Sequence, residues 1–195
     1  TITREVRRPA RLILPAGLLF FGPMAAMFTI IARDRAVAAE VLPSAMLDRA
    51  EQAANRQRTG SGYIDDPEVF RPVFASSIVA NNIQVTFSVF ALGMTAGIGT
   101  LLLLLTNGLS IGGFAGLYQS YGVLELLIRF VAPHGVLELT AITIAGGAGF
   151  LVGSAIILPG PLTRGEALVR KGRRAVRLIA GSTLLLIPAG LIEGL

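Results

Sequence analysis

The sequence contains no cysteine, no tryptophan and a single histidine, and only 15% of its 195 residues are charged. Without cysteine the fold cannot be stapled by disulfides, and one histidine leaves too few of the ligands that zinc sites usually use. The charged fraction is well below the ~25% that is usual in a soluble domain. A hydrophobic content of 53% and a mean hydropathy of +0.69 exclude intrinsic disorder. This composition predicts an integral membrane protein.

The charged residues are unevenly distributed along the chain. The net charge is +5 and the sequence pI is about 10.7, values that would suggest nucleic-acid binding in a soluble protein. Here many of the basic residues gather in two short stretches, 4–11 and 164–177, and each stretch lies next to an apolar run. Because membrane topology accounts for such clustering, we expect a lipid bilayer and no nucleic acid as partner.

The long apolar runs predict an all-α fold, a polytopic bundle of about five membrane-spanning helices in a single integral membrane domain, residues 1–195. The first run lacks a cleavage site for signal peptidase and is expected to stay as an anchor. The third run either crosses the membrane or enters and returns. The expected spans are residues 12–31, 83–105, 111–131, 136–158 and 178–192.

Turn-forming residues separate the expected spans. Thr106-Asn107-Gly108 is expected to end the second span, and Pro133-His134-Gly135 to precede the fourth. The polar segment 32–72 between the first two spans is expected to lie outside the cytoplasm. Within it, residues 43–58 have helix-forming composition, and Asp66 followed by Pro67 resembles a helix start.

The distribution of arginine and lysine predicts the orientation of the bundle. Four arginines precede the first span, and the loop 161–177 carries six basic residues against one acid. Five crossings place both regions on the same side of the membrane, which the positive-inside rule identifies as the cytoplasm. The sequence therefore predicts a multi-pass protein of the inner (cytoplasmic) membrane with a cytoplasmic N-terminus and a cytoplasmic basic loop.

Glycines recur four residues apart within the apolar runs. Small residues at this spacing allow helix backbones to approach closely in lipid. We expect a tightly packed bundle and, for at least one pair, a possible homodimer interface. The pairs are Gly93 and Gly97, Gly112 and Gly116, Gly149 and Gly153, and Gly190 and Gly194.

A few polar residues lie in or beside the apolar runs, where they are costly and need a reason. Glu125 and Arg129 stand four residues apart and can pair on one helix face. His134 and Glu138 have the same spacing, so they share a face and could hold a proton, bind a cation, cap the helix or anchor it at the interface. Glu193 either lies at the interface or faces a polar cavity with Glu138. Without further ligands or a nearby serine, neither a metal site nor a hydrolase dyad is expected, and no cofactor is expected.

Three blocks of the sequence resemble the stage II sporulation protein M family, over roughly residues 66–195. The blocks are Asn81-Asn82 through Thr106-Asn107-Gly108, the segment 130–139 with a following glycine-rich span and Pro159-Gly160, and the segment 189–194. The positions at which this chain matches the family motifs are Asn81, Asn82, Asn107, Pro133, His134, Gly135, Glu138 and Glu193.

The resemblance implies a function without catalytic residues. In endospore-forming bacteria, members of this family are membrane components of a complex that brings cell-wall hydrolases to the engulfing septum, and the founding member is regarded as a scaffold. Relatives are often encoded beside MoxR-type AAA+ ATPases. We therefore expect a non-enzymatic scaffold of a cell-envelope complex, with a cell-wall hydrolase complex or a MoxR-type ATPase system as partner. The alternative is a transporter or channel with a polar site around Glu138 and Glu193.

Overall fold

The structure is a computed structural model, and it describes the backbone of residues 2–59 and 71–193. Side-chain surroundings are described for residues 11–59, 80–129 and 131–190. Every regular element in these residues is a helix, which confirms the predicted all-α bundle. The elements are α1 (Ile2–Arg33), α2 (Ala36–Val41), α3 (Ser44–Thr59), α4 (Arg71–Ala91), the short 3₁₀ turn η2 (Leu92–Met94), α5 (Ile98–Ser120), α6 (Leu124–Ile157) and α7 (Arg164–Glu193).

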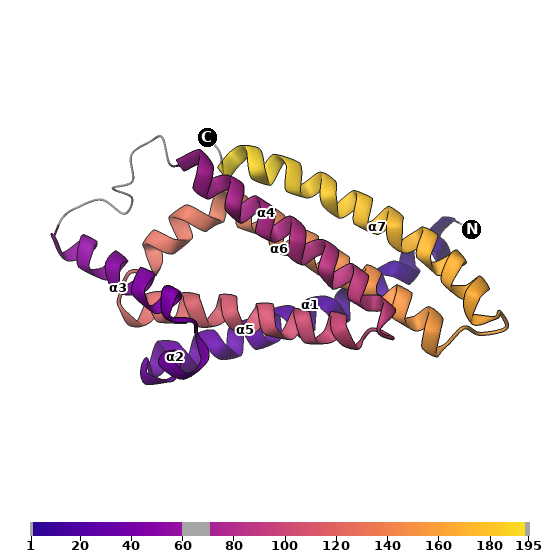
Figure 1. Cartoon of the computed structure of the whole chain (residues 1–195), viewed down its shortest axis with the longest axis horizontal. Coiled ribbons are helices and arrows are strands. Elements are labelled where there is room, and N and C mark those ends of the chain that lie inside the picture. The colour runs from indigo at the N-terminus through magenta and orange to yellow at the C-terminus, as the bar shows by residue number, and fades with distance from the viewer. Residues whose placement is uncertain (1, 60–70, 194–195) are drawn as a thin grey trace.

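The five long helices run between the two ends of an elongated molecule (Figure 1). Helices α4, α5, α6 and α7 follow one another in alternating directions, so successive turns lie at opposite ends. Helix α1 lies along α5, and α7 lies along α6. The short helices α2 and α3 fold back against the end of the bundle at which α1 ends. The N-terminus and the α6–α7 connection share the other end.

Helices α1 and α5 are held together by a ladder of three glycines on α5. A Cβ atom added to Gly108, Gly112 or Gly116 would meet the backbone carbonyl of Phe20, Met24 or Phe28, respectively. Because both series advance by four residues, the two helices pack in parallel with a constant register. Gly112 and Gly116, one of the glycine pairs expected from the sequence, thus lie against the α1 backbone, and Gly108 adds a third step.

A second pair of glycine contacts joins the α4–α5 turn to α6. A Cβ on Gly93 would meet the backbone of Gly149, and a Cβ on Gly153 would lie 2.6 Å from the backbone nitrogen of Gly97. Two of the predicted glycine pairs therefore pack against each other. Gly190 is half-buried on α7, and Gly194 lies outside the described residues.

The expected helix 83–105 is wrong, because the chain turns at residues 92–97. Gly97 has φ +85° and Ala96 has φ +57°, the left-handed conformation that ends a helix and that glycine adopts readily. The Thr95 hydroxyl accepts a hydrogen bond from the Gly99 N–H at 2.8 Å and so caps the start of α5. The predicted turn at residues 106–108 lies inside α5, where the Thr106 hydroxyl and the Asn107 amide donate to carbonyls of their own helix.

The expected break between residues 131 and 136 is also wrong, and so is the division into spans 111–131 and 136–158. The chain turns at residues 121–123, where Gly122 has φ +73°, and α6 continues through Pro133. Proline removes one backbone donor from a helix and bends it, which a membrane helix tolerates. Figure 1 shows that α6 changes direction early in its length.

Several other expected elements agree with the structure. Residues 12–31 lie inside α1, and residues 178–192 lie inside α7. The helix expected at 43–58 is α3. The basic stretch 161–177 is not a loop, because it is helical from Arg164 onward. The helix start expected at Asp66 and Pro67 lies outside the described residues.

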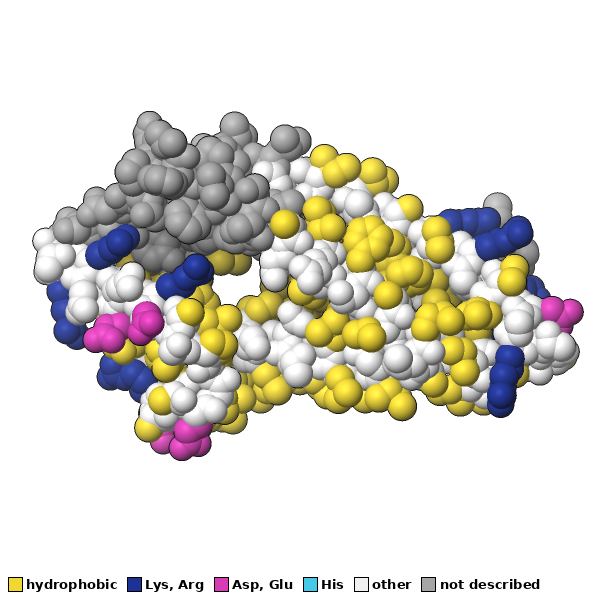
Figure 2. All heavy atoms as spheres, viewed as in Figure 1, with side chains coloured by type: hydrophobic (Ala, Val, Ile, Leu, Met, Phe, Trp, Pro, Cys, Tyr) yellow, Lys and Arg dark blue, Asp and Glu magenta, His cyan; other side chains and the backbone are white. Residues whose placement is uncertain are grey.

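The surface agrees with a membrane protein. Figure 2 shows an apolar middle zone and charged side chains gathered at the two ends. Large side chains such as Leu14, Leu18 and Leu184 are at least 66% exposed on the long helices. Among the described residues, three helical segments are long and apolar enough to cross a membrane: Arg11–Arg33, Ile98–Ser120 and Val131–Ile157.

Candidate functional site

His134 and Glu138 lie on one face of α6 and point into the bundle. They are 3% and 5% exposed, respectively, so the shared face predicted from their four-residue spacing is a buried one. A buried carboxyl group is unusual, because removing a carboxylate from water is costly.

The register of α4 on α6 places further polar residues near Glu138. The two helices run in the same direction, and Gly93 of η2, directly after α4, packs against Gly149 on α6. Asn82 and Glu138 each lie eleven residues before the glycine of this contact. The two residues therefore lie at about the same height in the bundle. Asn82 is half-buried, whereas its neighbour Asn81 is exposed.

Thr86, one turn further along α4, is a functional candidate that the sequence did not indicate. It is fully buried, and its hydroxyl oxygen has no hydrogen-bond partner among the described residues. Its spacing of four from Asn82 places both on one helix face, a signal that becomes readable once the bounds of α4 are known.

Helix α7 brings the third family block to the same end of the bundle. It runs antiparallel to α6, and Lys171 is bonded to the α6 carbonyls of Ser154 and Leu158. Counting from the bonded Lys171 forward along α7 and from its partners back along α6 places Gly190 near the level of Glu138. The backbone of Glu193 follows one turn later. Figure 1 shows the start of α4 and the C-terminus at this end. The Glu193 side chain is not described.

The remaining motif positions have local roles in the structure. The Asn107 amide donates to the Leu103 carbonyl of its own helix, α5, at 2.8 Å. Pro133 is exposed, and Gly135 is buried on α6. Glu125 and Arg129 form the predicted ion pair, with 2.6 Å between Oε1 and Nη2.

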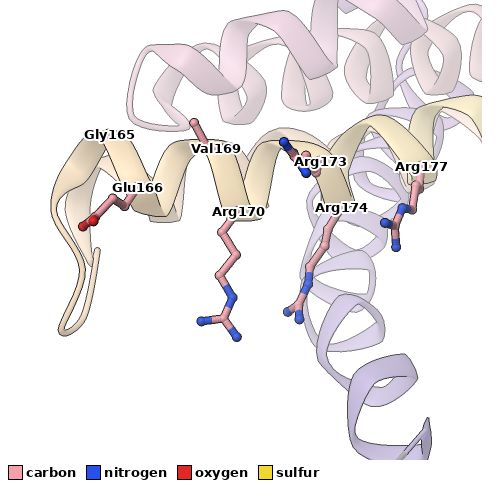
Figure 3. Close-up of a pocket in the computed structure, with 7 residues that line it drawn as sticks. All are labelled: Gly165, Glu166, Val169, Arg170, Arg173, Arg174 and Arg177. Atoms are coloured by element: carbon pink, nitrogen blue, oxygen red, sulfur yellow. The ribbon is translucent and has the colours of Figure 1, made fainter.

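The opposite end of the molecule carries a basic groove on the first turns of α7. The groove has a volume of about 790 Å³, and Figure 3 shows Arg170, Arg174 and Arg177 extending to the same side of the helix. The residues that line it are Gly165, Glu166, Val169, Arg170, Arg173, Arg174 and Arg177.

A capping box begins α7 beside this groove. The Glu166 carboxylate accepts hydrogen bonds from the Thr163 backbone N–H at 2.9 Å and from the Thr163 hydroxyl at 2.8 Å. These bonds, the backbone one first, lower the pKa of Glu166. The carboxylate is therefore engaged in holding the helix start.

Lys171 belongs to the helix packing. Its Nζ donates to the Ser154 and Leu158 carbonyls at 2.9 and 3.0 Å and to the Ser154 hydroxyl at 3.1 Å. It thereby satisfies the C-terminal carbonyls of α6. Partial burial lowers the pKa of Lys171.

The buried end offers an imidazole, a carboxylate, a hydroxyl and an amide, groups that can hold a proton or a hard cation. The described residues contain no group of three His, Cys, Asp or Glu side chains that could hold a metal ion. Ser154 lies twenty residues from His134 on the same helix, a separation of about 30 Å, so these two cannot form a dyad. The Ser182 hydroxyl donates to the Ile179 carbonyl at 2.9 Å.

Comparisons with known proteins support the resemblance. The family model "Stage II sporulation protein M" matches residues 16–195. An uncharacterized protein of Methanocaldococcus jannaschii is 34% identical over 77 residues, which are 39% of this chain and 43% of that protein. The chain thus covers less than half of the length of that relative. No solved structure matches the chain.

Proposed function

Because the chain belongs to the stage II sporulation protein M family, we propose that it is a non-enzymatic integral membrane scaffold of a cell-envelope complex. The observation that carries the proposal is the platform formed by α2 and α3. It lies at one end of the bundle (Figure 1), and its exposed residues include charged side chains. Its partner would be a cell-wall hydrolase complex, or a MoxR-type AAA+ ATPase system acting on the opposite side.

The platform is attached by its own apolar face. Ala50, Ala53 and Ala54 of α3 are buried in one cluster with Leu117 and Tyr118 of α5. A surface that is already ordered loses less conformational entropy when a partner docks. A fixed platform therefore suits a docking role better than a loose tether.

The start of α2 is held by polar contacts as well. The Asp34 carboxylate accepts the Ala36 N–H at 3.0 Å, and the Arg35 guanidinium lies 4.3 Å from the centre of the Tyr121 ring. A cation over an aromatic face contributes about 0.5–1 kcal/mol at an exposed site. These contacts fix the direction in which the platform leaves α1.

The outer face of the platform carries both signs of charge. Glu40, Asp48, Arg49 and Glu51 are all exposed. Mixed charges suit a protein partner, because complementary charges give specificity and orientation.

The proposed topology is a multi-pass protein of the cytoplasmic membrane in which α1, α4, α5, α6 and α7 cross and the N-terminus is cytoplasmic. The excess of arginine at the end that holds the N-terminus and the start of α7 supports this orientation.

Single-cysteine labelling tests the topology cleanly, since the chain has no native cysteine. A membrane-impermeant maleimide should label Asp48→Cys in intact spheroplasts and Arg164→Cys only after permeabilisation. The reverse pattern, or equal labelling of both positions, would contradict the orientation.

Photo-crosslinking in cells tests the docking role. A photoreactive residue at position 48 or 51 should give discrete protein adducts, whereas one at Leu18, which is 66% exposed on the apolar side of α1, should give none. The Asp48→Lys/Glu51→Lys variant should lose the adducts at an unchanged expression level. Absence of protein adducts from both platform positions would contradict the scaffold proposal.

A transporter or channel is the second candidate function, and buried polar groups inside the bundle favour it. Glu138 on α6 is buried, and the buried Thr86 hydroxyl on α4 has no hydrogen-bond partner among the described residues. In proteoliposomes, a transporter would show proton or cation flux that Glu138→Gln abolishes and Thr143→Val does not; Thr143 is a buried threonine whose hydroxyl is bonded to its own helix. A scaffold would show no flux above protein-free liposomes, and Glu138→Gln would keep the platform adducts.

A further inference from the structure

Four arginines on the first turns of α7 line the basic groove, and the three exposed ones, Arg170, Arg173 and Arg177, are here called the arginine face. Arg170, Arg173 and Arg177 are exposed, and Arg174 is half-buried. Figure 3 shows Arg170 and Arg177 extending to the same side of α7, with Arg174 between them. A guanidinium presents parallel N–H donors that match the oxygens of a phosphate.

The described residues that line the groove place one acid beside the exposed Arg170, Arg173 and Arg177. Glu166 is the one acid among the described lining residues, and its carboxylate is engaged by Thr163 at the helix start. Lys171 points away from the groove to the α6 carbonyls. The exposed guanidinium groups of Arg170, Arg173 and Arg177 therefore suit an anionic ligand.

The position of the arginine face along the long axis of the bundle indicates which anion lies next to it in a membrane. Lys171 bonds the carbonyl of Leu158, which is 72% exposed, and the neighbouring Ile157 is 60% exposed. The apolar outer surface of α6 thus reaches the level of Lys171. From there α7 runs back along α6 toward the apolar middle zone, and Arg177 lies six residues, about 9 Å, further along.

An arginine at this depth lies where the bilayer places its phosphate groups, at the edge of the hydrocarbon layer. Apolar side chains alternate with the arginines: Val169 and Val176 are 59% and 56% exposed. An occupant that offers phosphate oxygens and acyl chains together matches this pattern. A water-soluble acidic peptide matches only the charge.

We propose that the arginine face of α7 binds the headgroup phosphates of anionic phospholipids at the membrane edge. This binding goes beyond the scaffold role. It gives the end of the molecule opposite the platform a lipid ligand, which would hold α7 at one leaflet of the membrane. Each arginine near an anionic surface changes the binding constant by about fivefold.

Native mass spectrometry of the full chain, delipidated in detergent and titrated with phosphatidylglycerol or phosphatidylcholine, tests the proposal. The wild-type chain should bind phosphatidylglycerol at least ~10-fold more tightly, and Arg170→Gln/Arg173→Gln/Arg177→Gln should reduce this preference to within ~2-fold. The control Arg33→Gln/Arg49→Gln/Arg58→Gln removes as much charge from the other end and should keep the preference.

Helical circular dichroism should be unchanged in both triple variants, since all six arginines are exposed. If the first triple variant did not fold, the single variants Arg170→Gln and Arg177→Gln would still each lower the preference. Three results would overturn the proposal: an unchanged preference in the folded variants, displacement of phosphatidylglycerol by millimolar inorganic phosphate, or tighter binding of polyglutamate than of phosphatidylglycerol. The last would identify an acidic protein as the ligand.

Discussion

Replacing Gly112 with alanine tests the glycine ladder between α1 and α5. The new Cβ would overlap the backbone carbonyl, carbonyl carbon and Cα of Met24. None of these atoms belongs to a flexible side chain, so α1 itself must move away. The helices can remain packed only at a greater separation.

The size of the effect follows from the packing of the core. Phe20 lies at the preceding step of the ladder and is fully buried, in one cluster with Ala16 and Leu104. A gap of roughly 0.5–1 Å forfeits a quarter to a half of the dispersion energy of each contact. Overpacking of this kind costs about 1–3 kcal/mol, against a gain of about 0.5–1 kcal/mol from removing a helical glycine. The expected net loss is about 1–2 kcal/mol.

Thermal unfolding followed by circular dichroism in a mild detergent measures this change. Gly181→Ala is the matched control, because Gly181 is also helical but has no atom within 4 Å of a Cβ position. The control should be neutral or slightly stabilising. If Gly112→Ala were as stable as Gly181→Ala, close packing of α1 on α5 would not be the reason for this glycine.

Three further predictions concern hydrogen bonds. Hydrogen bonding lowers the pKa of Glu166, so its carboxylate stabilises the start of α7 at pH values above the pKa of the unfolded carboxyl group. This stabilisation is lost as the pH falls through the pKa of the folded state. Hydrogen exchange at residues 164–168 should therefore rise on acidification of the wild type, and it should be high already at neutral pH in Glu166→Gln. Lys171→Met should lose the bonds to the α6 carbonyls and about 1–2 kcal/mol in thermal unfolding, and an unchanged melting temperature would refute this role. Thr100→Val should lower the free energy of unfolding by about 1 kcal/mol, because the buried Thr100 hydroxyl donates to the Val89 carbonyl at 2.7 Å. The control Thr106→Val, at an exposed position, should have less effect. Equal melting temperatures of the two variants would count against the cross-helix bond.

Local spacing predicted features that depend on one helix alone. The four-residue spacing of Glu125 and Arg129 predicted their ion pair, and that of His134 and Glu138 predicted a shared face. The helix-forming composition of residues 43–58 predicted α3. In these cases helical periodicity suffices, because no partner element is needed to decide the outcome.

The positions of the turns could not be predicted in the same way. Gly97 and Gly108 read alike in the sequence, yet Gly97 has φ +85° in a turn, whereas Gly108 is helical and lies against the Phe20 carbonyl. Glycine can either adopt a left-handed turn or allow close packing of two helices, and only the neighbouring backbone decides between these two roles. The level shared by Asn82 and Glu138 likewise follows from the register of α4 on α6.

The amino-acid sequence by itself determined that the protein lies in a lipid bilayer and that its fold is all-α. With 53% hydrophobic residues and long apolar runs, a helical bundle is the structure that satisfies the backbone hydrogen bonds in lipid. The tertiary structure decided where the chain reverses and which polar groups meet. It also separated Lys171, which is bonded to α6, from the nearby Arg170 and Arg173, which are exposed. The physical reason is that burial and hydrogen-bond partners belong to pairs of helices, and no single stretch of sequence contains both members of a pair.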